Sequence, residues 1–305
     1  MKAIMQNDFS GIAGLAMTTM ADPKVSAFSV IVRNQFIPVL PYDWLTGEGA
    51  LKAIRPVKLP MVIGYGFGGI VEQVGRLRNQ KLVGRAVIGI QPNGAAKTII
   101  NSQVPPLLFK VPQNVTLQAA TTLIGGGDAA LHAVQKSWIN KNDIVLVTGA
   151  SGGVGTYLVQ LLKLAGATVI ALASSNNLAF VRTLGADYVL NYQTDLRQQL
   201  RNVPQPNKVI DTVGQQDLLT LISQQYETLA ILSLSIPFFR PMKINQHFEF
   251  SNGSVGINGY QQLLAMLANH QLRAHIQAEY NFEDIKKAHF DSKNGHSQGR
   301  ILLKF

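Results

Sequence analysis

Four glycines between residues 149 and 155 carry the clearest chemical signal in this chain. The stretch 144–155 (IVLVTGASGGVG) reads as a buried strand that turns through glycines into a helix, and Val169–Leu172 begins the next strand. Glycines at such a turn let bare backbone N–H groups at a helix N-terminus approach a diphosphate. The spacing also fits a βαβ unit of roughly 30 residues. The sequence therefore predicts a dinucleotide-binding site.

The end of the second strand indicates which dinucleotide binds. An NAD site usually carries Asp or Glu there, about 20 residues past the glycines. This chain has Ser174, Ser175, Asn176 and Asn177 instead, and its next acid is Asp187. Hydroxyl and amide groups can donate to a 2′-phosphate, which a carboxylate would repel, so NADP(H) is favoured over NAD(H). Arg182 could reach the same phosphate, or it could be a solvated helix residue.

The pattern of apolar, Gly and Pro residues along the chain predicts the helices and strands that position this site. Up to about residue 118, short β-branched runs alternate with Gly and Pro and predict a compact, partly open barrel. Its strands include Ser29–Arg33, Gly69–Val74 and Leu82–Ile90. From about Leu117, helices alternate with buried strands, and six parallel strands with covering helices are expected.

The second region can be divided into individual elements. Asp128 is placed to be the N-cap of a helix that runs through Ala129 to Trp138. The predicted strands are 144–147, 168–172, 188–190, 208–211 and 229–233, and the predicted helices are 154–165, 177–184, 216–224 and Gly259–Asn269. The final segment, Arg300–Phe305, is expected to be a strand that returns to the first domain.

Composition narrows the function classes. The chain has 305 residues, no cysteine and a formal net charge of +10. Without cysteine there are no disulfides and no thiolate metal sites, which fits a reducing, cytoplasmic location. No signal peptide is visible and no apolar run approaches the ~18 residues of a membrane span, so no membrane association is expected. A basic balance favours anionic ligands.

Nucleic-acid binding is the alternative explanation for the positive charge, and the distribution of basic residues does not favour it. The densest group is Arg76, Arg78, Lys81 and Arg85, which is most simply a solvated loop and strand edge. The basic residues elsewhere are dispersed among acidic ones. We therefore do not expect specific nucleic-acid binding from the sequence.

Taken together, five segments resemble the medium-chain dehydrogenase/reductase superfamily, in its zinc-independent quinone oxidoreductase-like branch. They are 62–75 (VIGYGFGGIVEQVG), 148–155 (TGASGGVG), 184–192 (LGADYVLNY), 209–214 (VIDTVG) and the end from Ala288-His289 through 299–303 (GRILL). The resemblance covers nearly the whole chain. It implies an α/β protein with a Rossmann doubly wound parallel sheet and a GroES-like β-barrel catalytic domain, and a homodimer.

The resemblance also implies domain limits and a cofactor. Residues 1–118 and 263–305 would form the GroES-like catalytic domain, and residues 119–262 the Rossmann domain, with NADPH in the cleft between them. The cofactor-binding residues that it implies are Ser151, Gly152, Gly153, Val154, Gly155, Ser174, Ser175, Asn177, Tyr192, Val213, Gly214, Leu232, Ser233 and Leu234. Tyr42, Trp44 and Tyr65 would border the substrate pocket.

Departures from the family pattern bear on the chemistry. Zinc-containing relatives have Gly-His-Glu where this chain has Gly64-Tyr65-Gly66, so no metal is expected. Leu40 replaces an asparagine near the nicotinamide. Gly127-Asp128-Ala-Ala stands in place of Gly-Leu-Thr-Ala, which removes a hydroxyl, and Asn177 stands where many relatives have a phosphate-binding lysine.

The function implied by the resemblance is that of a zinc-independent, NADPH-dependent oxidoreductase that transfers hydride to a quinone, enal or enone. Tyr65, and after it Tyr42, are the candidates for stabilising or protonating the developing oxyanion, although Tyr65 could also simply fill space. Bulk water is the alternative proton source, and His132 reads as a packed or capping residue. Two alternatives stay open: a non-catalytic NADPH-binding sensor, and a basic nucleotide-binding protein that also binds nucleic acid.

Overall fold

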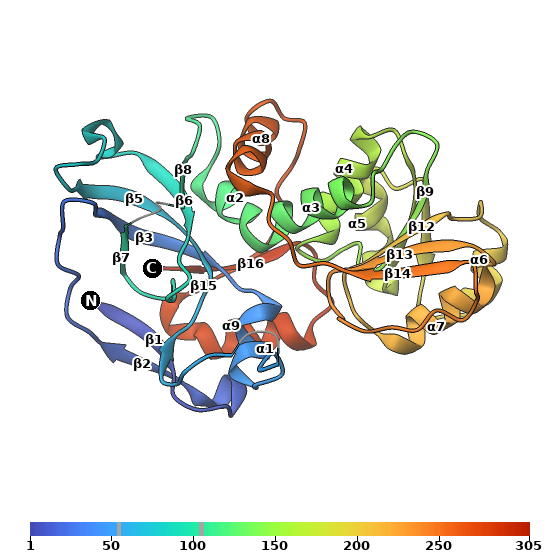
Figure 1. Ribbon diagram of the computed structural model, residues 1–305, viewed down its shortest axis with the longest axis horizontal. Coiled ribbons are helices and arrows are strands. Elements are labelled where there is room, and N and C mark those ends of the chain that lie inside the picture. The colour runs from blue at the N-terminus through green and yellow to red at the C-terminus, as the bar shows by residue number, and fades with distance from the viewer. Residues whose placement is uncertain (54–55, 104–106) are drawn as a thin grey trace.

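The computed structural model describes residues 1–53, 56–103 and 107–305. These residues form three sheets, of six, seven and three strands. Figure 1 shows the six-stranded sheet at one end of an elongated molecule and the other two sheets at the opposite end. Helices α2 (Leu117–Thr121), α3 (Asp128–Lys136) and α8 (Gly256–Ala268) lie between the two ends. Among the helices of the described ranges, none is long and apolar enough to cross a bilayer.

The six-stranded sheet is a Rossmann sheet with all neighbouring strands parallel. Its order is β11-β10-β9-β12-β13-β14. The strands are β9 (Ile144–Val147), β10 (Thr168–Ala173), β11 (Tyr188–Asn191), β12 (Lys208–Asp211), β13 (Leu229–Ser233) and β14 (Gln246–Phe250). The winding direction reverses between β9 and β12. In doubly wound sheets ligands bind outside the carboxyl ends of the strands at such a point.

Alternation along β9 explains why its sequence is apolar throughout. Val145 and Val147 are buried in a cluster on one face of the sheet, and Leu146 is buried in a cluster on the other. Successive side chains of a strand point to opposite faces, so a strand covered on both sides needs apolar residues at every position. The helices that flank these strands are α4 (Gly155–Leu164), α5 (Leu178–Thr183), α6 (Leu196–Arg201) and α7 (Gln216–Gln225).

The seven-stranded sheet has the order β15-β16-β3-β5-β6-β8, with β7 paired to β3. The strands are β3 (Val30–Pro38), β5 (Gly66–Val74), β6 (Ala86–Ile90), β7 (Ile99–Ser102), β8 (Leu108–Lys110), β15 (Ile276–Asn281) and β16 (Arg300–Lys304). A second sheet, β2-β1-β4, contains β1 (Lys2–Gln6), β2 (Leu15–Thr19) and β4 (Met61–Val62). Together they form the expected GroES-like barrel around their own apolar cluster.

Both ends of the chain contribute to this barrel. Strand β16 pairs antiparallel with β3, with Leu303 opposite Ile37. The prediction that residues 300–305 return to the first domain is therefore confirmed. Helices α1 (Pro41–Gly47) and α9 (Ile285–Asn294) lie next to the barrel (Figure 1). We keep 1–118 with 263–305, and 119–262, as the proposed domain limits.

Several sequence-based expectations were wrong in detail. Asp128 is not an N-cap: it is the first helical residue of α3, with φ −63° and ψ −47°, and Gly127 precedes it as the cap. An irregular turn, Leu123–Gly127, already brings the backbone into helical conformation there. The predicted strand Leu82–Ile90 is extended only over β6, because residues 80–82 form a helical turn. Helix α8 begins at Gly256 rather than Gly259.

Candidate functional site

The glycine run makes the tight turn between β9 and α4, and its members meet different demands. Gly149 has φ +65°, a conformation that L side chains rarely adopt. A Cβ on Gly155 would meet the carbonyl oxygen of Gly149 and lie 2.6 Å from Cα of Ala150, so glycine is required for close packing of helix and strand. A Cβ on Gly152 would meet a single atom within 4 Å, the Gly149 oxygen at 3.4 Å. The backbone at Gly152 therefore has open space beside it.

Two amides lie at the start of α4 beside this open space. Among the described residues the N–H of Val154 donates to no backbone or side-chain oxygen, whereas the N–H of Gly153 faces the carbonyl of Gly299 across the isolated bridge between Gly152 and Gly299. Both residues are partly exposed. Unpaired N–H groups at a helix N-terminus carry a partial positive charge and can bind an anion. This edge of the Rossmann sheet has the donors that a diphosphate needs.

The C-terminal segment before β16 closes one side of the glycine loop. The N–H of Gly299 donates to the carbonyl of Ser151 at 2.8 Å. Asn177 ties the same regions together, because its amide donates to Oγ of Ser151 at 2.9 Å and to the carbonyl of Ser297 at 3.1 Å. Asn177 is 2% exposed. Its amide thus holds the loop against the C-terminal segment, so contact with a ligand phosphate would require it to exchange these bonds.

Ser174 and Ser175 follow β10, as the sequence predicted. Ser174 is 3% exposed, and its Oγ has no hydrogen-bond partner among the described residues. Ser175 is exposed, and its hydroxyl donates to Gln193 at 2.9 Å and accepts from the Asn191 amide at 3.0 Å. A buried hydroxyl without a partner is unusual, because burial of an unpaired polar group is unfavourable. Exposed Arg182 lies on α5 after this segment.

The other predicted cofactor residues lie along the same edge of the sheet. The Tyr192 hydroxyl is 3.2 Å from Nδ1 of His296, in the C-terminal segment that covers the glycine loop. Val213 and Gly214 follow β12, and Val213 is 43% exposed. The segment 232–234 ends β13. The structure thus brings the predicted residues to the carboxyl ends of β9, β10, β11, β12 and β13, and their contacts with a cofactor stay a prediction.

Asp211, which sequence reasoning gave no role, organises this edge. It is 0% exposed and accepts hydrogen bonds from the hydroxyls of Thr148 and Ser233, both at 2.6 Å. The backbone amides of Val213 and Gly214 also donate to it, at 3.2 and 3.1 Å. A buried carboxylate surrounded by donors is stabilised by charge-assisted bonds. It fixes the ends of three strands relative to one another.

Arg300 is a second residue that sequence reasoning missed. Its guanidinium is buried and donates to the carbonyls of Val39, at 3.1 Å, and Gly125. It also lies against the glycine loop, where a Cβ on Gly153 would run into it. Burial lowers the pKa of Arg300 to about 10, so the group keeps its positive charge at neutral pH. A buried cation therefore stands beside the expected diphosphate position.

The aromatic candidates for the substrate pocket separate into two groups. The rings of Tyr42 and Tyr65 are 5.8 Å apart in an edge-to-face arrangement, and both are partly exposed. Trp44 is only 8% exposed and packs against His289 in the barrel core, with ring centroids 6.0 Å apart. The structure therefore brings Tyr42 and Tyr65 together but leaves Trp44 in the core. Leu40 packs on Gly125, where a Cβ would touch it at 2.6 Å.

Asp128 and Tyr260 form a polar pair near these aromatic residues. The Tyr260 hydroxyl donates to Oδ2 of Asp128 at 2.5 Å, and Oδ1 accepts from the Ala129 amide. Burial, the Asp128 carboxylate and Tyr65 raise the pKa of Tyr260. Burial also raises the pKa of Asp128. His132 is 2.7 Å from the Ser251 hydroxyl, as a packed histidine would be.

The donor set for a metal ion is poor. In the described ranges, no group of three or more His, Asp or Glu side chains could hold a metal ion, and the chain has no cysteine.

The sequence and fold of this chain are similar to those of known oxidoreductases. Residues 153–230 match a family model described as zinc-binding dehydrogenase. A chloroplast envelope quinone oxidoreductase homolog of Arabidopsis thaliana is 32% identical over 205 residues, which are 64% of this chain and 62% of that protein. The solved quinone oxidoreductase of Coxiella burnetii is 25% identical, covers 100% of this chain and 99% of its own, and superimposes with a TM-score of 0.88. The chain is therefore similar to members of the medium-chain dehydrogenase/reductase superfamily, and within it to quinone oxidoreductases. It spans less than two thirds of the length of the chloroplast relative that it matches.

A further solved structure has the same fold. A mycobacterial protein in complex with NADPH is 22% identical, covers 100% of both chains and has a TM-score of 0.84. This superfamily combines a Rossmann domain with a GroES-like domain, which is the pair of folds described above. The departures at Leu40 and Asp128 are therefore changes within a shared architecture.

Proposed function

We propose that this chain is an NADPH-dependent oxidoreductase that transfers hydride to a quinone or to the C=C bond of an enal or enone, without zinc. The observation that carries the proposal is the start of α4, where the unpaired amide of Val154 and the amide of Gly153 lie beside the open face of Gly152. Such an arrangement at a helix N-terminus supports binding of a diphosphate. The names of the related quinone oxidoreductases support the reaction class.

The residues present fit NADPH at both ends of the site. The amides of Gly153 and Val154 would bind the diphosphate, and Arg300 beside them adds positive charge. The unpaired Oγ of Ser174 and the exposed Ser175 hydroxyl would bind the 2′-phosphate. No carboxylate side chain occurs at positions 174–177 to repel it. When bound, NADPH supplies the hydride.

This chain's own residues would orient the reactants and stabilise developing charge. Tyr65, with Tyr42 packed against it, is proposed to donate a hydrogen bond to the oxyanion that forms on the acceptor. It follows Gly64 at the junction between β4 and β5. The proton required at carbon would come from solvent or from this phenol. Trp44 is proposed to support α1 from the barrel core rather than to touch the substrate.

The donor set supports zinc independence, since the chain has no cysteine and, by the resemblance, Tyr65 stands where zinc relatives carry a histidine. The non-catalytic sensor and the nucleic-acid-binding protein are not favoured, because the related proteins are named as oxidoreductases. A homodimer also remains a proposal. Strand β14 is an edge of the Rossmann sheet and could pair with a second copy.

The test is NADPH oxidation, followed by absorbance, with a panel of small quinones, enals and enones. We expect turnover that is faster with NADPH than with NADH and that is unchanged after treatment with a chelator. Tyr65→Phe should lower kcat and change KM much less. Tight NADPH binding without turnover on any acceptor would contradict the proposal and favour the sensor. Loss of activity on chelation, restored by zinc, would contradict its zinc-independent form.

A further inference from the structure

Two stretches of the chain that contribute to the barrel contain no acidic residue. From Gln73 to Gly127 the chain contains six Lys and Arg residues and no Asp or Glu. From Pro23 to Tyr42 it also has no acid. The acids that precede these two stretches are already paired: Asp22 with the N-terminal ammonium at 2.6 Å, and Glu72 with Arg33 at 2.5 Å. Arg33 is thus neutralised, but no ion pair among the described residues involves Lys24, Arg76, Lys81 or Arg85.

Hydrogen bonds hold two loops of these stretches together. They are residues 24–28, before β3, and residues 75–85, between β5 and β6, and we call their joint surface the barrel-end surface. The amide of Leu77 donates to the Ala27 carbonyl at 2.9 Å. Nε of Arg78 donates to the Phe28 carbonyl at 2.8 Å, and its guanidinium lies 5.8 Å from the Phe28 ring centre. The two loops thus present one surface.

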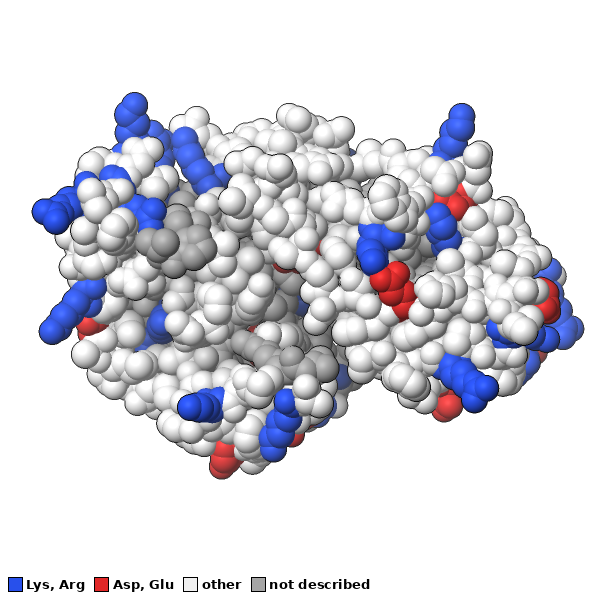
Figure 2. Space-filling view, viewed as in Figure 1, with Lys and Arg blue, Asp and Glu red and all other residues white. Residues whose placement is uncertain are grey.

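Apolar side chains project from the barrel-end surface among its cations. Leu77 is 60% exposed, Phe28 47%, Val83 46% and Val25 44%. The exposed cations of the same two loops are Lys24, Arg76, Lys81 and Arg85. Figure 2 shows Lys and Arg side chains gathered over the part of the molecule where Figure 1 draws β5 and β6. Apolar side chains exposed to water do not favour solubility, and a group of them among cations indicates an interaction surface.

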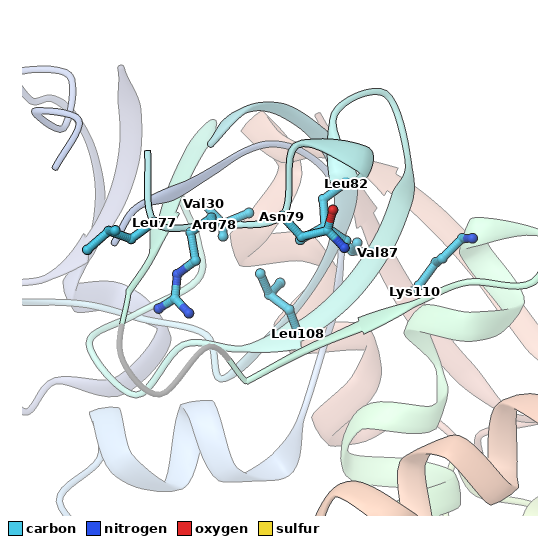
Figure 3. Close-up of a pocket in the computed structure, with 8 residues that line it drawn as sticks. All are labelled: Val30, Leu77, Arg78, Asn79, Leu82, Val87, Leu108 and Lys110. Carbon is cyan, nitrogen blue, oxygen red and sulfur yellow. The ribbon is translucent and has the colours of Figure 1, made fainter. Parts of the chain in front are cut away.

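A pocket of about 210 Å³ opens beside these loops. Its apolar lining comes from Val30, Leu82, Val87 and Leu108, together with Leu77. Figure 3 shows Arg78 and Lys110 on different sides of it, with Leu108 between them. An apolar hollow with a cation at each side suits a hydrocarbon group that carries an anionic head.

We propose that the barrel-end surface docks on an anionic lipid bilayer. Cations attract such a bilayer, and apolar tips enter its interface, so the two features act together. Single-stranded nucleic acid would need exposed aromatic faces for stacking. In residues 24–28 and 75–85 the only aromatic residue is Phe28, so successive bases would find no row of rings to stack on. The expectation of no membrane association considered only spanning segments, whereas this surface would bind peripherally.

The test is sedimentation of the full-length protein with vesicles of phosphatidylcholine, alone or mixed equally with phosphatidylglycerol. We expect binding to the mixed vesicles that weakens as salt rises, and little binding to phosphatidylcholine alone. Arg76→Gln with Lys81→Gln should lower the partition coefficient about 25-fold, because each cation near an anionic surface contributes a factor of about five. Leu77→Ser should lower it at least about tenfold without changing its salt dependence.

The matched control is Arg201→Gln with Arg240→Gln, which removes two exposed cations from the Rossmann domain and gives the same net charge. It should change the partition coefficient by less than about twofold, since this domain would face away from the lipid. An equal loss in the control would show nonspecific attraction and overturn the proposal. An unchanged Leu77→Ser variant would overturn it too. So would single-stranded RNA binding that exceeds vesicle binding and depends on Arg76 and Lys81.

Vesicle binding is measured without substrate or cofactor, so its outcome is independent of the proposed activity. Thermal melts of each variant should match the wild type, because the four replaced cations and Leu77 are all exposed.

Discussion

Replacing Gly152 by alanine separates cofactor binding from folding. A Cβ at this position would meet only the Gly149 oxygen, at 3.4 Å, and the residue has no positive φ. Alanine therefore fits the fold and should raise the free energy of unfolding by about 0.4–1 kcal/mol, because it restricts the unfolded chain. The same methyl group would occupy the open space in which the diphosphate approaches the amides of Gly153 and Val154.

The expected loss of binding follows from those two amides. A hydrogen bond to a charged group contributes about 1.5–3 kcal/mol, so losing both removes at least about 3 kcal/mol. The dissociation constant for NADPH should rise at least about 100-fold. Calorimetric titration gives this constant, and a thermal melt of the same sample reports stability. Gly152→Ala should thus melt at or above the wild-type temperature and bind NADPH poorly.

Gly155→Ala is the matched control. Its Cβ would overlap the Gly149 carbonyl and lie 2.6 Å from Cα of Ala150, so α4 must shift away from β9. Overpacking of this kind costs about 1–3 kcal/mol, and we expect a lower melting temperature. Unchanged NADPH affinity in Gly152→Ala, with the protein fully folded, would refute the assignment of the diphosphate to this loop.

Three further predictions test other parts of the account. Ser174→Asp should weaken NADPH binding far more than NADH binding in fluorescence titrations, because a carboxylate repels the 2′-phosphate; equal effects would place that phosphate elsewhere. Asp211→Asn places an amide NH₂ against the hydroxyls that now donate to the carboxylate. It should lower the free energy of unfolding, measured in urea, by about 3 kcal/mol. An unchanged free energy of unfolding would show that these bonds contribute little. Burial lowers the pKa of His289 to about 4. As pH falls below about 6.5, His289 is protonated in the unfolded chain before it is protonated in the folded protein. The free energy of unfolding therefore falls by about 3 kcal/mol by pH about 4. His289→Leu should remove that part of the pH dependence, measured by urea unfolding at each pH.

Local patterns were sufficient to predict most of the Rossmann domain. The run at 144–147 is apolar at every position because both faces of β9 are covered, and its bounds were predicted correctly. The glycines marked the strand-to-helix turn for steric reasons that act within a few residues. Strand β14 was not located from the sequence: Gln246–Phe250 alternates polar with aromatic residues, as an edge strand that is only partly buried can.

The residues that were missed act through contacts distant in sequence. Arg300 meets the carbonyls of Val39 and Gly125, which lie 261 and 175 residues away. Asp211 meets Thr148 across the sheet, at a separation of 63 residues. No periodicity reports such partners. Asn177 was assigned to the phosphate from its place in the motif, whereas its bonds to Ser151 and Ser297 depend on how the C-terminal segment folds back.

Calorimetric titration of the wild-type protein with NADPH and, separately, with NADH tests the central claim most directly. We predict one molecule of NADPH bound per chain, with a lower dissociation constant than that for NADH. Absence of binding heat for both cofactors, confirmed by a second method such as fluorescence, would contradict the claim that the glycine loop holds a nicotinamide dinucleotide.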